Sequence, residues 1–286
     1  MNETMTDKLA NFVVQAQYAD LPEEVSHEVK RVLLDSVGCA FGGHSTERGK
    51  IAGDLAMRLG GPPESTIIGV KNKVSCTNAA FANGELINAL DFDALSAAGH
   101  DVPCLISAAL ALAESCSTTG KNLILAIALS FEISHRLDLK VPPIAEGSDR
   151  GKLRWPQVLG QSAATLAVAA SAGKILNLDK DKLANAISIA GFICPPNVSR
   201  KCMTTAPFRM TKYGPAGAVA QAGITSALLA EMGYTGDTDL FDGEFGFWTY
   251  IGQGEWEKAR GEKVLSDLGV EWYSHMMNYK QYPCGI

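Results

Sequence analysis

The helical spacing of apolar residues, which recurs along most of the chain, most constrains the fold. Between residues 21 and 43, Val25, Val29 and Val32 lie on one stripe of a helix that Gly42-Gly43 should end. The same spacing predicts helices at 51–59, 78–90, 102–117, 121–137, 157–176, 180–191 and 215–232. The pattern therefore predicts a mainly α protein.

One short β ribbon is expected among these helices, formed by Ser65 to Gly69 and Lys73 to Ser75. No repeat, low-complexity tract or linker interrupts the sequence, so residues 1–286 are expected to form one domain. A hydrophobic content of 47% is sufficient for a full core.

Charge and composition exclude several classes of protein. A formal net charge of −6 argues against a nucleic-acid partner. Apolar runs such as 163–172 are too short to span a membrane, and the first residues lack the pattern of a signal peptide. The seven cysteines are odd in number and scattered, which favours a reducing compartment. We therefore expect a cytoplasmic protein without membrane contact.

The segment from Asp91 to His100, between two expected helices, is the first candidate site. It holds the carboxylates of Asp91 and Asp93 and one imidazole, and Asp101 is expected to cap the next helix. His100 would then lie beside a helix N-terminus, whose dipole favours the neutral ring. A neutral imidazole beside carboxylates is suited to acid–base chemistry, although capping and turn formation would also account for these residues.

A metal site is not expected here. Asp91 and Asp93 are two residues apart and would point to different sides of a helix. The sequence contains no HExxH motif, no CxxC pair and no histidine cluster that could complete a ligand shell.

Two lysines form further candidates. Lys212 precedes an Ala/Gly-rich helix, whose N-terminus attracts anions, and Arg200, Lys201 and Arg209 add local positive charge. A solvated basic loop would explain the same residues. Lys280 lies in a Pro-containing segment near the end and, taken alone, is typical of a surface lysine.

Several motifs occur in one order over almost the whole chain: Leu34-Asp35-Ser36-Val37-Gly38, Asn78-Ala79-Ala80-Phe81-Ala82-Asn83-Gly84, Ala89-Leu90-Asp91-Phe92-Asp93 with His100, the helix after Lys212, and Lys280 with Tyr282-Pro283-Cys284. In this order they resemble the MmgE/PrpD family, which includes 2-methylcitrate dehydratases, cis-aconitate decarboxylases and an iminodisuccinate epimerase. The resemblance implies a helical domain, usually a homodimer, that acts on a small polycarboxylate without metal or organic cofactor. It implies Asp91, His100, Lys212 and Lys280 as catalytic residues.

These residue types fit the chemistry that the resemblance implies. Dehydration, decarboxylation and epimerisation of such acids all develop negative charge next to a carboxylate, which ammonium groups stabilise. His100 could move a proton to or from carbon, with Asp91 orienting it or sharing the transfer. Asp93 and Tyr282 are expected to bind substrate.

The sequence also departs from the family pattern. Arg154 stands where the family usually has a second histidine; it cannot act as an acid or base near neutral pH, but it can bind a carboxylate through two hydrogen bonds. The family's Asp-Phe-Asp-Asp-Thr run becomes Asp91-Phe92-Asp93-Ala94-Leu95. Family chains continue into an α/β lid domain that is absent here, so we expect either a truncated sequence, with 264–286 starting the connection, or a separate lid subunit.

The leading hypothesis is a cofactor-independent lyase, either a dehydratase or a decarboxylase, that acts on a small di- or tricarboxylate. An epimerase or isomerase would use the same proton transfer without a leaving group. A non-catalytic carboxylate-binding subunit is the alternative of another class, favoured by the missing histidine and lid. Retention of Asp91, His100, Lys212 and Lys280 together argues against it.

Overall fold

The computed structural model describes residues 3–139, 161–195, 206–212, 214–243, 245–247 and 258–284. The helices in these ranges are α1 (Met5–Gln15), η1 (Tyr18–Asp20), α2 (Glu23–Gly43), α3 (Glu47–Leu59), α4 (Cys76–Asn88), α5 (Val102–Ser115), α6 (Gly120–Leu139), α7 (Gln161–Ile175), α8 (Lys180–Ile193), α9 (Ala216–Glu231) and α11 (Lys258–Leu265). The strands are β1 (Ser65–Thr66), β2 (Lys73–Val74), β3 (Leu95–Ser96) and β4 (Met277–Asn278). The expected mainly α fold is confirmed.

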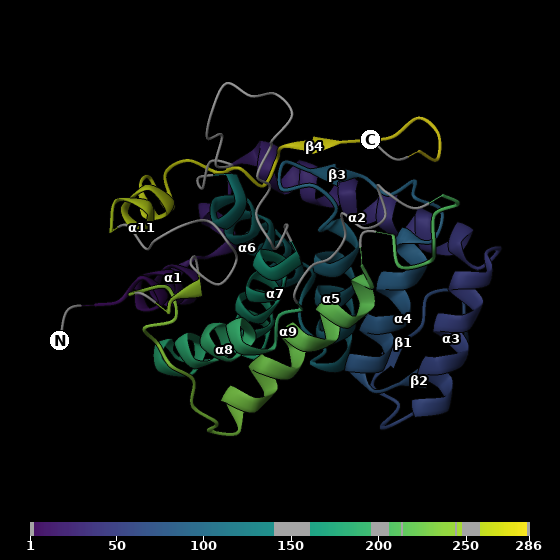
Figure 1. Ribbon diagram of the computed structural model, residues 1–286, viewed down its shortest axis with the longest axis horizontal. Coiled ribbons are helices and arrows are strands. Elements are labelled where there is room, and N and C mark those ends of the chain that lie inside the picture. The colour runs from purple at the N-terminus through teal and green to yellow at the C-terminus, as the bar shows by residue number, and fades with distance from the viewer. Residues whose placement is uncertain are drawn as a thin grey trace.

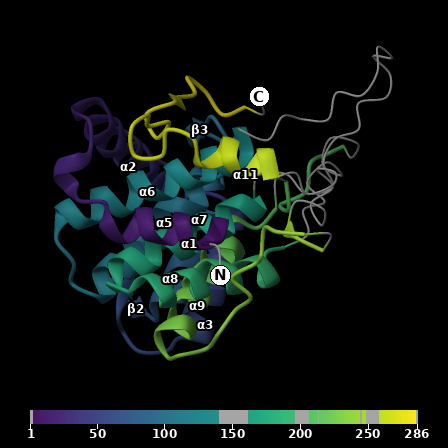
Figure 2. The same cartoon turned by 90° about the vertical axis from the view of Figure 1, so that its left-hand side faces the viewer.

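The centre of the molecule is built from α5 and α7, which other helices surround (Figures 1 and 2). Nearly every residue of α7 is buried, and most are Ala, Ser or Gly. A helix that is apolar on all sides belongs in a core, and its small side chains let α6, α8 and α9 pack closely around it.

Helices α4 and α9 cross with their backbones in near contact. A Cβ atom built on Gly217 would lie 2.3 Å from the carbonyl oxygen of Phe81, and one on Gly84 would lie 3.1 Å from the Cα atom of Gly217. A side chain at Gly217 would collide with the backbone of α4, and one at Gly84 would be tightly packed against α9. This crossing fixes the start of α9 against the middle of α4.

Both strand pairs are short and antiparallel. The expected ribbon is present as β1 and β2, with Ser65 opposite Val74. The second pair was not expected: β3 follows the Asp91 segment, whereas β4 lies close to the end of the chain, and Ser96 pairs with Met277. Figure 1 shows β4 lying beside β3 above the helices. This pairing brings the C-terminal segment to the candidate site.

Several helix boundaries differ from those predicted. Helices α1 and α11 were not predicted; Thr4 begins α1 with a capping box, in which its hydroxyl oxygen accepts from the Asp7 amide at 3.1 Å and the Asp7 carboxylate accepts from the Thr4 amide at 3.1 Å. Helix α4 begins at Cys76, before the predicted residue 78, and Ser75 is its N-cap.

A buried ion pair holds the C-terminal segment against α6. The side chains of Arg136 and Glu132 are fully buried and 2.5 Å apart. The Arg136 guanidinium also donates to four carbonyl oxygens between 264 and 271, and Glu132 accepts from the Tyr273 amide at 2.7 Å. We refer to Arg136 and Glu132 as the α6 clasp.

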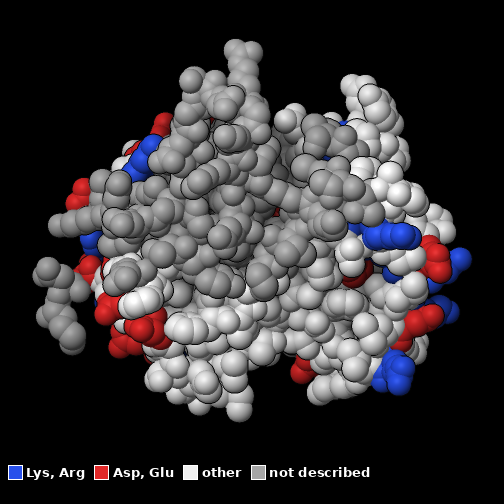
Figure 3. Space-filling view, in the orientation of Figure 1, with Lys and Arg blue, Asp and Glu red and all other residues white. Residues whose placement is uncertain are grey.

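The face drawn in Figure 3 has acidic and basic side chains interspersed near its edges, and among the described residues they do not gather into one basic patch. Within the described ranges, no helix combines the length and apolar character needed to cross a bilayer.

Candidate active site

The turn after α4 places the Asp91 carboxylate between two lysines. Asp91 has φ of +52°, in the left-handed region that aspartate tolerates better than most side chains. Its amide donates to the Asn88 carbonyl at 3.0 Å, which closes the turn. The two carboxylate oxygens consequently face different partners.

Lys280 binds one of these oxygens. Its Nζ atom lies 2.9 Å from Asp91 Oδ1 and 3.0 Å from the Asp91 carbonyl oxygen, and its side chain is fully buried. The amide of Cys284 donates to the same carbonyl at 3.1 Å. The interpretation of Lys280 as a surface lysine is therefore wrong, and the reason is the pairing of β4 with β3.

Lys212 binds the other oxygen. Its Nζ atom forms an ion pair with Asp91 Oδ2, and its side chain is 14% exposed. The lysine lies just before α9, in a segment whose Gly214 has φ of +87°. Nearby Arg209 is exposed, whereas Arg200 and Lys201 lie outside the described residues.

The His100 ring is neutral at pH 7. Burial, together with the positive charges of Lys280 and Lys212, lowers its pKa to about 4, and Asp91 acts in the opposite direction. The sequence pointed to the dipole of the following helix as the cause of a neutral ring. The structure adds burial and two ammonium groups, so His100 is available to accept a proton across the neutral pH range.

Asp93 points into the protein instead of toward solvent. It is 0% exposed, and its Oδ1 atom accepts from Asn88 Nδ2 at 3.1 Å. Burial raises its pKa to about 6, although Lys280 opposes the shift. The structure therefore places Asp93 beneath the Asp91 turn.

The other two expected substrate-binding residues differ in placement. Tyr282 is 67% exposed and follows Lys280 on the surface. Arg154 lies outside the described residues.

Asp101 is the N-cap residue of α5, but its side chain does not cap the helix as expected. Its buried carboxylate instead accepts from the hydroxyl groups of Ser96 and Ser134, each at 2.5 Å. These contacts tie β3 to α6. His100 lies between Ser96 and Asp101, so these contacts restrain the short segment that carries it.

Sequence reasoning missed the residues that support the Asp91 turn. Asn88 on α4 receives a hydrogen bond from Arg48 at 2.8 Å, and Arg48 also pairs with Glu85 at 2.7 Å. The available signal was the spacing of Glu85 and Asn88, three residues apart on one side of α4.

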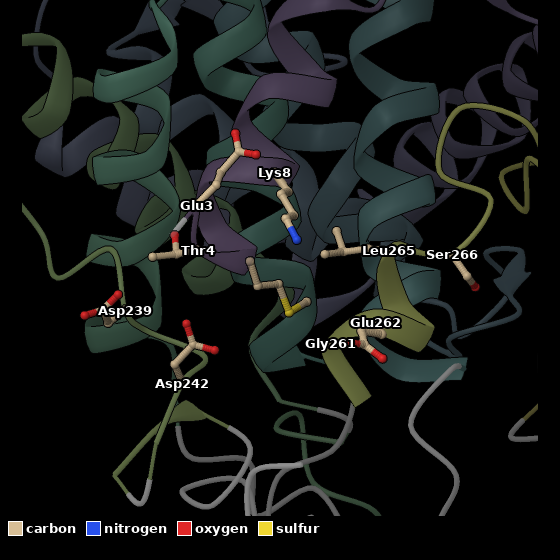
Figure 4. Close-up of a pocket in the computed structure, with 10 residues that line it drawn as sticks. Glu3, Thr4, Lys8, Asp239, Asp242, Gly261, Glu262, Leu265 and Ser266 are labelled. Atoms are coloured by element: carbon tan, nitrogen blue, oxygen red, sulfur yellow. The ribbon is translucent and has the colours of Figure 1, made fainter. Parts of the chain in front are cut away.

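A separate cavity of about 650 Å³ lies between the start of α1 and α11, away from these residues. Figure 4 shows Asp239 and Asp242 on one side of it and Glu262 on the other, with Lys8 between them. This acidic lining would repel a polycarboxylate. Among the described residues, no three His, Cys, Asp or Glu side chains are grouped as metal ligands.

The fold and the site together define a helical domain with a lysine–aspartate–lysine cluster beside a neutral histidine. The profile of the MmgE/PrpD N-terminal domain matches residues 7–259, and the chain belongs to the MmgE/PrpD family.

The curated proteins similar to this chain include several cis-aconitate decarboxylases. The chain is 30% identical to a human cis-aconitate decarboxylase over 257 residues, which are 87% of this chain and 51% of the relative. It is 29% identical to cis-aconitate decarboxylase-like protein oryM of Aspergillus oryzae, over 98% of this chain and 58% of the relative. Identity to a cis-aconitate decarboxylase of Aspergillus terreus is 26%, over 98% and 57%. The chain thus spans about half the length of the curated relatives it matches.

Proposed function

We propose that this chain carries an active site of a cofactor-independent lyase that acts on a small di- or tricarboxylate. The observation that carries the proposal is the convergence of Lys212 and Lys280 on the Asp91 carboxylate, with the neutral His100 close enough to be influenced by all three charges. The names of the relatives favour decarboxylation of cis-aconitate or a similar acid.

The residues divide the chemistry between them. In a dehydration the neutral imidazole of His100 accepts a proton from a carbon next to a carboxylate, the adjacent C–O bond breaks, and the hydroxide takes a proton from a lysine ammonium and leaves as water. In a decarboxylation the C–C bond breaks, carbon dioxide leaves, and the electron pair left on carbon takes the N–H proton of His100, whose ring is then reprotonated by a lysine ammonium. In both reactions Lys212 and Lys280 stabilise the negative charge that develops on the remaining carboxylate.

Asp91 holds the two ammonium groups in place before substrate arrives. Without it, two neighbouring positive charges would repel each other, and each lysine would lose an ion-pair partner. A substrate carboxylate can share the ammonium protons with Asp91. This gives Asp91 an organising part in the site as well as any part in proton transfer.

The test is incubation of the whole protein, isolated from its native source, with cis-aconitate, citrate and 2-methylcitrate in D₂O, followed by ¹H NMR. Appearance of an acid that has lost one carboxylate identifies a decarboxylase, and a change in the double bond with uptake or loss of water identifies a dehydratase. Exchange of a carbon-bound hydrogen for deuterium without net product would support the alternative of an epimerase. Binding of these acids without product or exchange would contradict catalysis and favour the non-catalytic subunit.

The homodimer, the separate lid subunit and the cytoplasmic location stay predictions. The same preparation tests two of them, since its native mass and any co-purifying chain report the oligomeric state and a lid partner.

A further inference from the structure

A line of buried and part-buried hydrogen bonds joins the start of α9 to the Asp91 turn. It begins at Glu85, a 6% exposed residue of α4, whose Oε1 atom accepts from the Gly217 amide at 2.9 Å. The N-cap residue of α9, Pro215, offers no side-chain cap. Glu85 therefore supplies from a neighbouring helix the negative charge that a helix N-terminus favours.

The line continues through α3. Glu85 Oε2 accepts from Arg48 Nε at 2.7 Å, and Arg48 Nη1 donates to Asn88 Oδ1 at 2.8 Å. Asn88 Nδ2 then donates to Asp93 Oδ1 at 3.1 Å, while the Asn88 carbonyl accepts from the Asp91 amide. The planar guanidinium bridges two acceptors at once, which a lysine could not do in the same geometry.

The two ends of this line lie close in sequence to Lys212 and Asp91, which form an ion pair. Gly217 follows Lys212 closely in sequence, and Asn88 precedes Asp91 by one turn. The glycine crossing of α4 and α9 leaves the backbones no room to slide toward each other. A displacement of about 1 Å in a catalytic group can change a rate by about a hundredfold.

We propose that Glu85 and Arg48 are positioning residues, which hold the start of α9, and with it Lys212, in register with the turn that carries Asp91. They touch no reacting atom and act through the ion pair between Lys212 and Asp91. Their effect on turnover rests on the proposed function, whereas their effect on the geometry of the site does not.

The test is Glu85→Gln in the whole protein, which keeps the side-chain volume and removes the charge. We expect kcat to fall by about 10–100-fold with KM changed by less than about threefold. The matched control is Gln221→Ala, which removes the 3.1 Å hydrogen bond from Gln221 to Asn78 elsewhere in the α4–α9 interface. We expect the control to lower stability without lowering kcat.

A second readout does not depend on turnover: the titration midpoint of the His100 ring, followed by NMR and assigned with His100→Gln. If Lys212 is displaced in Glu85→Gln, its positive charge acts less on His100, and the midpoint should rise above that of the wild-type protein. Loss of the Glu85 charge alone would lower the midpoint, so the sign separates displacement from a direct charge effect.

These readouts separate the two proposals. If the His100 midpoint rises in Glu85→Gln but the wild-type protein turns over none of the acids, the positioning role is supported and the proposed lyase activity is contradicted. An unchanged or lowered midpoint, or an equal fall of kcat in Glu85→Gln and Gln221→Ala, would overturn the positioning role. If Glu85→Gln does not fold, Arg48→Lys tests the same point, because an ammonium cannot bridge Glu85 and Asn88 in the same geometry.

Discussion

At the scale of single residues, burial shifts the pKa values of Asp93 and His100 in opposite directions, because it disfavours the charged form of each side chain. Asp93 has its pKa raised to about 6, so folding favours its protonated form, and His100 has its pKa lowered to about 4, so folding favours its neutral form. The Asp93 contribution to stability is complete below its unfolded pKa of about 3.9 and is lost as pH rises through 6. The His100 contribution is lost as pH falls from about 6.5 through 4.

Asp93→Asn should expose the first of these effects. The variant stays neutral at all pH values, so its free energy of unfolding relative to wild type should rise between pH 4 and pH 8 by about 2–3 kcal/mol. Urea unfolding at several pH values measures this difference, in which the common His100 contribution largely cancels. Asp54→Asn, at an exposed position of α3, is the control for the loss of one carboxylate charge. Parallel curves for wild type and Asp93→Asn would show that Asp93 is not held as a buried acid.

The sequence predicted residue types better than residue environments. Asp91, His100 and both lysines were selected from motifs, but the burial of Lys280 and the inward direction of Asp93 depend on contacts between distant segments. Asp101 shows the same limit. Its position suited an N-cap, yet two serine hydroxyls from other elements outcompeted the local amides for its carboxylate.

At the scale of elements, the α6 clasp decides where the C-terminal segment lies. Arg136 and Glu132 are both fully buried, and the guanidinium donates to backbone carbonyls at the end of α11 and in the segment after it. Tyr279 adds a second attachment, since its hydroxyl donates to Glu28 on α2 at 2.7 Å. Between these two attachments, β4 pairs with β3, and Lys280 follows.

Glu132→Ala should destabilise the protein by about 3–5 kcal/mol, because it leaves the Arg136 charge buried without its closest partner. Urea unfolding measures the loss, and hydrogen exchange should show residues 264–284 losing protection before α3. The matched control is Lys73→Ala, which removes an exposed ion pair with Glu114 and should cost less than about 1 kcal/mol. Equal losses for the two variants would contradict the role of the clasp.

Helices were predictable from sequence where an apolar stripe, an N-cap residue and a C-terminal glycine occurred together. The helix predicted at 215–232 is an example of the last of these, because Gly233 follows α9 with φ of +96°, which is typical of a helix stop. The capping box at Thr4 was present in the sequence, but α1 was overlooked. Strands β3 and β4 have two residues each, and most of the chain separates them in sequence. No local pattern could therefore predict that they pair.

At the scale of the whole molecule, four side chains from distant parts of the sequence meet because helices and one strand pair fold over a common core. Asp91 follows α4, His100 precedes α5, Lys212 precedes α9, and Lys280 follows β4. Three of these positions lie at helix ends, where a side chain can reach a shared space while its helix stays packed. The arrangement makes the site sensitive to helix placement, which is the reason for testing Glu85 and Arg48.

The central claim is that His100 exchanges a proton with a carbon of a carboxylic acid held by Lys212 and Lys280. The most direct measurement compares the whole protein and its His100→Gln variant for turnover and for deuterium incorporation at carbon, with the acid identified by the substrate panel. We predict a fall of at least about 100-fold in both rates, with acid binding and the free energy of unfolding nearly unchanged. Equal rates in the two proteins would contradict the account, because His100 would then have no part in moving the proton.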